Sequence, residues 1–227
     1  MTPLYEDNHI IIVYKEAGEI VQGDKTGDKP LSETVKEWIK TEHNKPGNVF
    51  LGVVHRLDRP VAGIVVFGKT SKATARLNKM FREGEIHKTY WAIVQGRPAD
   101  DEATLTDWIL RKEKINKSFA YDHEVPASKN AILSYKVLTH GDNYSLLEVN
   151  LKTGRHHQIR CQLANIGCPI KGDLKYGARR SNADGSISLL SHRVEFVHPV
   201  SHKTIIVESP LPHDRLWETL SKDACKG

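Results

Sequence analysis

The sequence predicts an α+β fold with a mixed, largely antiparallel central β-sheet and flanking helices and loops. Apolar runs with the period of strands dominate the middle of the chain, and amphipathic segments with the period of helices occur between them. At 227 residues the chain can bury a sizeable core, and neither an internal repeat nor a composition shift marks a linker. We therefore expect a single domain over residues 1–227.

Alternating or continuous apolar stretches mark the expected strands. They cover residues 10–13, 61–67, 89–94, 103–110, 131–138, 144–151, 189–196 and 204–208. The stretch 61–67 is almost unbroken and rich in valine, which is typical of a strand that is covered on both faces. This strand is expected at the centre of the sheet.

Helical periodicity predicts helices over residues 30–42, 71–82 and about 155–165, with a short helix at the end of the chain. Pro30 suits the start of the first helix, and Ser71 is expected to cap the second. The second helix carries Lys and Arg on its outer face. Gly154 precedes the third helix.

The charge and the cysteines limit the class of protein. A net charge of +5 and a pI near 9.0 favour a polyanionic partner such as nucleic acid. The three cysteines, Cys161, Cys168 and Cys225, form no CxxC pair, so neither a disulfide framework nor a zinc ribbon is indicated. No secretion signal or membrane-spanning run is present, and we expect a cytoplasmic protein.

The segment His55–Gly63, HRLDRPVAG, places Asp58 among basic side chains just before a buried strand. Nearby positive charge favours the ionised form of a carboxylate, which suits nucleophilic attack or proton abstraction better than proton donation. Taken alone, the same pattern also fits an aspartate that forms a turn or a salt bridge.

Two further segments carry polar or aromatic side chains that suit RNA. Residues 151–160, LKTGRHHQIR, place basic and amide side chains at a helix start, where unpaired backbone N–H groups attract anions. Residues 88–96, KTYWAIVQG, place Tyr90 and Trp91 in a strand, and such rings can stack on an unpaired base. A solvated helix end and ordinary core rings remain the alternatives for these two segments.

In order and spacing, these segments resemble the pseudouridine synthases that modify large-subunit ribosomal RNA and certain tRNAs. HRLDRPVAG resembles the HRLD motif of that family, HKTYWAIVQG its K-x-Y-x-A-x-V-x-G motif, and LKTGRHHQIRCQLANIGCPIKGDLKYG its TGR-x-HQIR and GD-x-x-YG motifs. LLSHRVEFVHP resembles a later Leu-x-x-His segment. The resemblance covers about residues 9–208.

The resemblance implies an isomerase, an intramolecular transferase that converts uridine to pseudouridine in structured RNA without a cofactor or a metal. Asp58 would be the catalytic carboxylate, Tyr90 would stack on the target uracil, and Arg160 would pair with Asp58. Ile159 and Leu57 would form apolar walls of the base pocket. The residues expected to bind RNA are His55, Arg56, Arg59, Lys88, Arg155, His156 and Gln158.

The chain departs from the family pattern in its early segment and at Cys168, where the family often has His before Pro-Ile. The early N-K-P-x-G segment is replaced here by Tyr14-Lys15-Glu16-Ala17-Gly18, which lacks the proline and leaves the contacts of this loop open. Because residue 9 already begins the resemblance, we expect no separate N-terminal RNA-binding domain. The core itself would then select a ribosomal RNA or tRNA stem-loop, and we expect a monomer without an obligate protein partner.

Other functions fit the pattern less well. A nucleoside or glycoside hydrolase would need a second carboxylate, and Glu83 and Glu85 resemble solvated charges at a helix end. A non-catalytic RNA-binding module is disfavoured by the presence of Asp58, Tyr90 and Arg160. A metalloenzyme is disfavoured because His156 and His157 are adjacent and do not have the i, i+4 spacing of metal ligands on a helix. The sequence leaves open which uridine is modified, and whether Asp58 attacks C1′ or removes the C2′ proton.

Overall fold

The computed structural model describes residues 1–224, and the chain divides into two compact units. The first unit comprises Met1–His87 and Ser191–Pro210, and the second comprises Lys88–Leu190 and the segment from Leu211. The chain therefore passes from one unit to the other three times. Single-domain behaviour stays a prediction.

The first unit contains a sheet in the order β1-β2-β4-β10, in which β3 also pairs with β4 and β11 with β10. The strands are β1 (Tyr5–Glu6), β2 (Ile10–Lys15), β3 (Gly52–Val53), β4 (Ala62–Gly68), β10 (Leu189–Val197, of which residues from Ser191 belong to this unit) and β11 (Thr204–Glu208). Pairing is antiparallel between β2 and β4, where Lys15 lies opposite Gly63.

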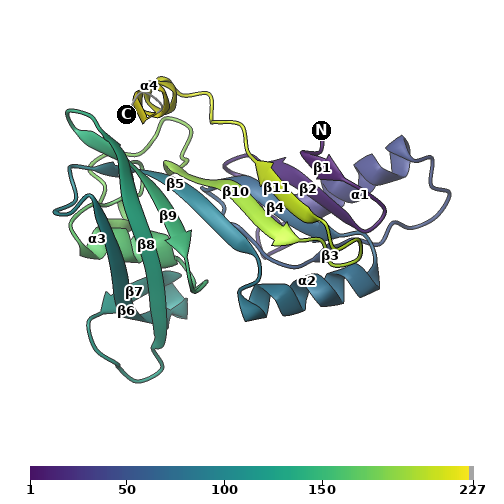
Figure 1. Cartoon of the computed structure of the whole chain (residues 1–227), viewed down its shortest axis with the longest axis horizontal. Helices are drawn as coiled ribbons and strands as arrows, with labels where there is room; N and C mark the ends of the chain where they lie inside the picture. Colours follow the sequence, from purple (N-terminus) through teal and green to yellow (C-terminus); the bar gives the residue numbers. More distant parts are fainter. Residues whose placement is uncertain (225–227) are drawn as a thin grey trace. The chain divides into compact units, whose positions relative to one another are not determined.

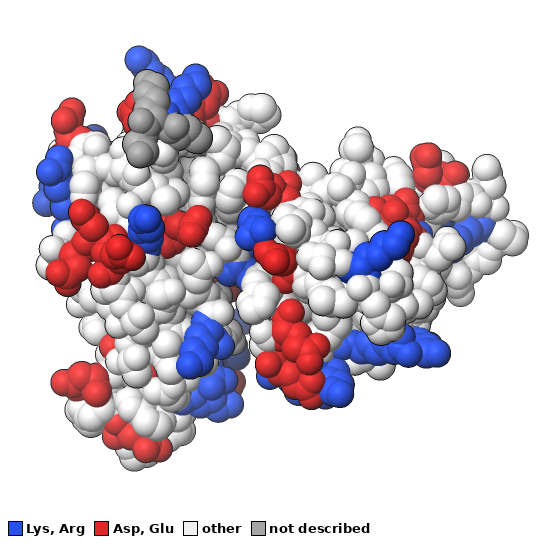
Figure 2. All heavy atoms as spheres, viewed as in Figure 1, with Lys and Arg blue, Asp and Glu red and all other residues white. Residues whose placement is uncertain are grey.

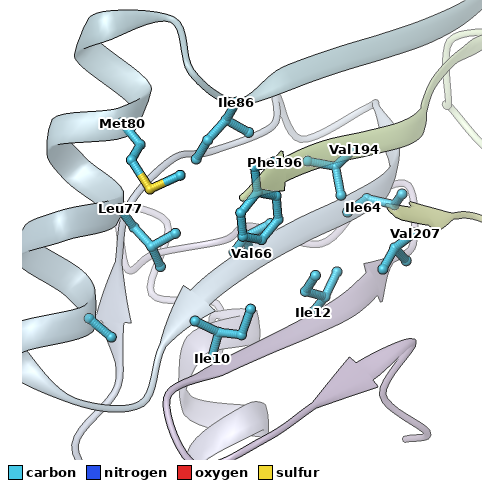
Figure 3. Close-up of a cluster of buried hydrophobic side chains, with 11 residues drawn as sticks. Ile10, Ile12, Ile64, Val66, Leu77, Met80, Ile86, Val194, Phe196 and Val207 are labelled. Atoms are coloured by element: carbon cyan, nitrogen blue, oxygen red, sulfur yellow. The ribbon is translucent and has the colours of Figure 1, made fainter. Parts of the chain in front are cut away.

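Helices α1 (Leu31–Glu42) and α2 (Ser71–Glu83) complete the first unit (Figure 1). Figure 3 shows Leu77 and Met80 of α2 pointing into a cluster of buried side chains that includes Ile10 of β2 and Val66 of β4. The other side chains of β4 are also buried, so this strand is covered on both faces, as its continuous apolar sequence predicts.

The second unit is built on an antiparallel sheet in the order β5-β9-β8-β6-β7. Its strands are β5 (His87–Gln95), β6 (Glu102–Lys112), β7 (Lys117–Tyr121), β8 (Lys129–His140) and β9 (Tyr144–Leu151). The helices are η1 (Glu113–Ile115), α3 (Gln158–Asn165), η2 (Leu174–Tyr176) and α4 (Arg215–Ala224). Helix α3 packs on β6, β7 and η2, and buries Cys161 beside Ile109 and Tyr176.

The expected mixed, largely antiparallel sheet with flanking helices is confirmed, with differences at element ends. Thr70, and not Ser71, caps α2, because the Thr70 side chain accepts a hydrogen bond from the Ala73 N–H group. Helix α3 begins at Gln158 and not at Arg155, because His157 has a left-handed backbone with φ of 54°. The short strands β1, β3 and β7 were not expected.

The structure also describes two of the three cysteines and the length and apolar character of the helices. Cys161 and Cys168 are buried free thiols, and Cys225 lies outside the described residues. None of the helices described combines the length and the apolar character needed to cross a lipid bilayer.

Candidate active site

Asp58 lies half-buried in a tight turn that immediately precedes β4. The Val61 N–H group donates to the Asp58 carbonyl oxygen at 3.0 Å and closes this turn. Leu57 beside it is buried, whereas Arg56 and Arg59 are exposed. The turn therefore fixes the backbone at Asp58, and the side chains of Arg56 and Arg59 on either side of it are exposed to solvent.

The basic side chains around the turn have different surroundings. His55 Nε2 accepts a hydrogen bond from the Val66 N–H group at 2.9 Å, and its ring stacks on Phe81 with centroids 4.7 Å apart. This contact makes Nε2 an acceptor, so a neutral His55 carries its proton on Nδ1. Arg59 pairs with Asp28 at 2.6 Å. The RNA contacts expected of His55, Arg56 and Arg59 stay predictions.

Gly63 allows β10 to approach the start of β4. Its φ is +119°, and a Cβ atom at this position would lie 2.4 Å from the Ser191 carbonyl oxygen. A side chain here would collide with backbone, which cannot rotate away. The glycine of the HRLDRPVAG segment is therefore required by close packing next to the Asp58 turn.

In the second unit, the residues before α3 form a turn held by Gln158. Its Oε1 atom accepts hydrogen bonds from Thr153 Oγ1 and from the Arg155 N–H group, each at 2.9 Å. Gln158 is buried, so these contacts give it a structural role, and its contact with RNA stays a prediction. Arg155 is exposed, and its Nε donates to the Asn130 carbonyl oxygen at 2.9 Å.

His156 and His157 stack on each other with ring centroids 3.7 Å apart. His156 contacts Ser118 Oγ through Nδ1 at 2.8 Å and Asn116 Oδ1 through Nε2 at 3.2 Å. His157 Nδ1 lies 2.8 Å from the Tyr176 hydroxyl. Burial, together with the nearby Arg160 charge, lowers the pKa of His157 to about 2, so its ring is neutral at physiological pH.

Arg160 lies on α3 with its side chain inside the unit. Its Nε donates to Asp173 Oδ2 at 2.7 Å and its Nη2 to Asp173 Oδ1 at 2.9 Å. The Tyr176 ring covers the guanidinium at 5.1 Å. Neither Asp173 nor Tyr176 was expected in the site, although both lie in the KGDLKYG segment of the family resemblance.

Strand β5 carries the expected stacking residue. Tyr90 is buried opposite Val149 of β9, and Ile159, expected in the same pocket, is buried on α3. Lys88 is half-buried, and burial lowers its pKa. The pairing of Arg160 with Asp58 and the stacking of uracil on Tyr90 stay predictions.

The described residues 1–224 contain no cluster of candidate metal ligands. No group of three or more His, Cys, Asp or Glu side chains in this part of the chain is placed to hold a metal ion.

Comparison with known proteins places these motifs in a family. Residues 9–165 match the family model described as RNA pseudouridylate synthase. The uncharacterized RNA pseudouridine synthase YhcT of Bacillus subtilis is 32% identical over 215 residues, covering 93% of this chain and 68% of YhcT. The tRNA pseudouridine synthase C of Salmonella typhi is 31% identical over 235 residues, covering 94% of this chain and 86% of that protein.

A solved structure supports the fold. Human RNA pseudouridylate synthase domain containing 4 superimposes with a TM-score of 0.79 at 20% identity, covering 98% of this chain and 92% of that one.

A further sequence relative is ribosomal large subunit pseudouridine synthase D of Zymomonas mobilis. It is 29% identical over 221 residues, covering 93% of this chain and 69% of that protein. On the family match and these identities, the chain belongs to the RNA pseudouridylate synthase family.

Proposed function

We propose that this protein isomerises uridine to pseudouridine in a ribosomal RNA or tRNA stem-loop, with Asp58 as the catalytic carboxylate. The observation that carries the assignment is the position of Asp58. It lies in a hydrogen-bonded turn before β4, inside the part of the chain that matches the family. Membership of the family confirms the expected reaction, the isomerisation of uridine to pseudouridine in ribosomal RNA or tRNA. The assignment of Asp58 is our proposal.

The reaction conserves every atom of the nucleoside. The bond between N1 and C1′ breaks, the bound uracil rotates, C5 forms a bond to C1′, and the proton on C5 leaves while N1 gains one. Asp58 assists the cleavage step, either by attacking C1′ or by removing the C2′ proton to give a glycal. The target uridine must first leave its base stack, at a cost of a few kcal/mol.

The proposal gives three further residues, Arg160, Tyr90 and Ile159, a part in the reaction. Arg160 would pair with the Asp58 carboxylate, in addition to its contacts with Asp173, because a guanidinium offers five N–H donors. Tyr90 would stack on the uracil, with Leu57 and Ile159 as apolar walls. Tyr90, Leu57 and Ile159 are each buried in their own unit.

Exposed arginines support binding of the RNA backbone. Arg56, Arg59 and Arg155 are solvent-exposed next to the turn of Asp58 or before α3. The face in Figure 2 shows Lys and Arg interspersed with Asp and Glu. With a net charge of only +5, we expect individual arginine contacts with phosphates to matter more than a uniformly positive surface.

The decisive experiment compares the wild type with Asp58→Asn, using Asp142→Asn as the control because Asp142 is an exposed loop residue. We expect Asp58→Asn to fold and bind RNA but to form no pseudouridine, whereas Asp142→Asn retains activity. Wild-type turnover by Asp58→Asn would refute the assignment. Release of free uracil would indicate a nucleoside hydrolase, and RNA binding by the wild type without any reaction would indicate a binding module.

An isotope experiment distinguishes the two roles of Asp58. RNA with deuterium at C2′ of the target uridine reacts more slowly if Asp58 removes that proton in a rate-limiting step. Attack of Asp58 on C1′ leaves the bond between C2′ and its hydrogen intact and gives no primary isotope effect. The comparison requires single-turnover rates, so that product release does not mask the chemical step.

The target is identified by mapping pseudouridines in total RNA from cells with and without the gene. One relative is named for tRNA and another for the ribosomal large subunit, so both RNAs belong in the assay.

We further propose that the protein acts in the cytoplasm as a monomer without an obligate protein partner. A mass near 25.6 kDa in light scattering would support the monomer. The buried free thiols of Cys161 and Cys168 are compatible with a reducing compartment.

A further inference from the structure

Helix α2 carries a row of basic side chains on its solvent face, which we call the α2 basic stripe. Its four members are all exposed: Lys72, Arg76, Lys79 and Arg82. They follow one another at intervals of three or four residues, so they lie along one side of the helix, whereas Leu77 and Met80 are buried. Figure 2 shows Lys and Arg side chains gathered where Figure 1 places α2.

The charges of the stripe do not stabilise α2 itself. The first turn of the helix contains no acidic residue, and Lys72 lies there instead. The start of a helix carries partial positive charge, so a lysine at this end is unfavourable. Lys72, Arg76 and Lys79 are also neighbours of like charge, which destabilises a helix. Within residues 1–224, only Lys79 of the stripe pairs with a carboxylate, that of Glu83 at 3.8 Å.

Helix α1 of the same unit shows the opposite arrangement of charge. Glu33 lies in its first turn and Lys40 in its last turn. Lys36 pairs with Glu33 at 2.8 Å, and Lys29, just before the helix, pairs with Glu37 at 2.5 Å. These positions complement the helix dipole or place opposite charges together. The stripe is therefore a property of α2, and a partner with negative charge would offset its repulsion.

A hollow of about 230 Å³ lies beside the stripe, between α2 and the turn after β10. Arg76 and Lys79 line it from α2, His202 lines it from the turn, and Glu85 is the acidic residue in the lining. Arg76 Nη1 donates to the Pro199 carbonyl oxygen at 2.6 Å, which holds the guanidinium against the turn. The hollow is therefore bordered by N–H donors from two elements, as a phosphate site requires.

We propose that the α2 basic stripe binds the phosphate backbone of the RNA substrate, in addition to the RNA-binding residues expected near Asp58 and before α3. From Lys72 to Arg82 the stripe extends about 15 Å along the helix axis, a length over which one strand of a duplex presents about four phosphates. The proposal rests on the proposed function for the identity of the RNA. RNA is favoured over an acidic protein because the chain belongs to a family that modifies RNA.

The test compares two triple variants of the whole protein. The α2 variant is Lys72→Gln/Arg76→Gln/Lys79→Gln, and the control is Lys29→Gln/Lys40→Gln/Lys45→Gln. The control is matched because its three lysines are exposed on or beside α1, and both variants lose three positive charges. Each protein is titrated at several salt concentrations with tRNA and with large-subunit ribosomal RNA from cells that lack the gene.

We expect the α2 variant to bind RNA about tenfold or more weakly than the control at about 0.1 M salt. The slope of log affinity against log salt should decrease in magnitude by about 2 to 3, because three phosphate contacts are lost. The RNA concentration that gives half the maximal rate should rise by the same factor as the dissociation constant, while the single-turnover rate at saturating RNA falls less than twofold. An affinity and a salt slope equal to those of the control would overturn the proposal.

Two further arms keep the outcome decisive. If the α2 variant does not fold, Lys72→Gln and Lys79→Gln are measured singly; each should lower the salt slope by about 1, and unchanged slopes overturn the proposal. Polyglutamate serves as the probe for an acidic protein: loss of its binding in the α2 variant with unchanged RNA affinity also overturns the proposal. A wild type that forms no pseudouridine would instead refute the proposed function, and the RNA affinities would still decide the role of the stripe.

Discussion

Arg160 and Asp173 form a two-point ion pair inside the second unit, with side chains 6% and 1% exposed. Two parallel N–H···O hydrogen bonds fix the guanidinium plane as well as its position. Asp173 itself is held by backbone, because its carbonyl oxygen accepts from the N–H groups of Tyr176 and Ala178, each at 3.0 Å. The KGDLKYG segment therefore sets the orientation of the arginine that we expect to contact Asp58.

Asp173→Asn should destabilise the protein by about 3–5 kcal/mol, because it removes the buried carboxylate that holds the Arg160 guanidinium at two points. Chemical denaturation measures this loss, with Asp142→Asn as an exposed control that should stay within about 0.5 kcal/mol of the wild type. A stability equal to that of the control would contradict a structural role for the ion pair.

Gly63→Ala should be strongly destabilising, by at least about 1–3 kcal/mol from backbone strain alone. Its Cβ atom would also lie 2.4 Å from the Ser191 carbonyl oxygen, so a strand would have to move. Gly47→Ala is the matched control, because no atom lies within 4 Å of its Cβ position. Equal thermal midpoints for the two variants would show that the close approach of β10 is not required.

His157 should make the protein sensitive to acid. Its folded pKa of about 2 lies below the ordinary value of 6.5, so the stability that neutral His157 contributes is present above about pH 6.5 and is lost as the pH falls toward the folded value. His157→Asn, which tolerates a left-handed backbone, should flatten the decline in unfolding free energy between pH 6.5 and pH 4. The exposed His123 provides a control, since His123→Asn should retain the wild-type slope.

Tyr90→Phe tests whether the hydroxyl group takes part in the chemistry. The aromatic ring remains, so stacking on uracil and RNA affinity should be preserved. If the hydroxyl accepts the proton from C5, cleavage should proceed while pseudouridine formation slows by about 100-fold or more. Unchanged turnover would exclude the hydroxyl as the base and leave Tyr90 with stacking alone.

Arg56→Ala and Arg155→Ala should each weaken RNA binding, because each removes a guanidinium that we expect to bind a phosphate. The slope of log affinity against log salt should decrease in magnitude by about 1 for each phosphate that is no longer neutralised. Arg215→Ala is the control, because Arg215 is exposed on α4 and is not among the residues expected to bind RNA. An unchanged salt slope in either test variant would remove that arginine from the proposed RNA surface.

The strands and helices with strong periodicity could be predicted because their pattern depends on local sequence. The predicted strand 144–151 coincides with β9, and the buried run at 61–67 corresponds to β4. The short strands β1, β3 and β7 were missed, because each is defined by its pairing with another strand more than by its own sequence. The start of α3 was misplaced, because the left-handed conformation of His157 is fixed by its surroundings.

The sequence alone determined the family motifs and the α+β class, because the order and spacing of chemical groups are properties of the chain. It also predicted Asp58 as the catalytic residue, and this assignment stays a prediction. Only the tertiary structure revealed that Asp173 holds Arg160, that Gln158 braces its own turn, and that Lys15 reaches the carbonyl groups behind Asp58. Arg59 and Val61 lie 44 and 46 residues from Lys15 along the chain. Such contacts arise from packing and from the need to satisfy buried polar groups, which spacing along a sequence does not encode.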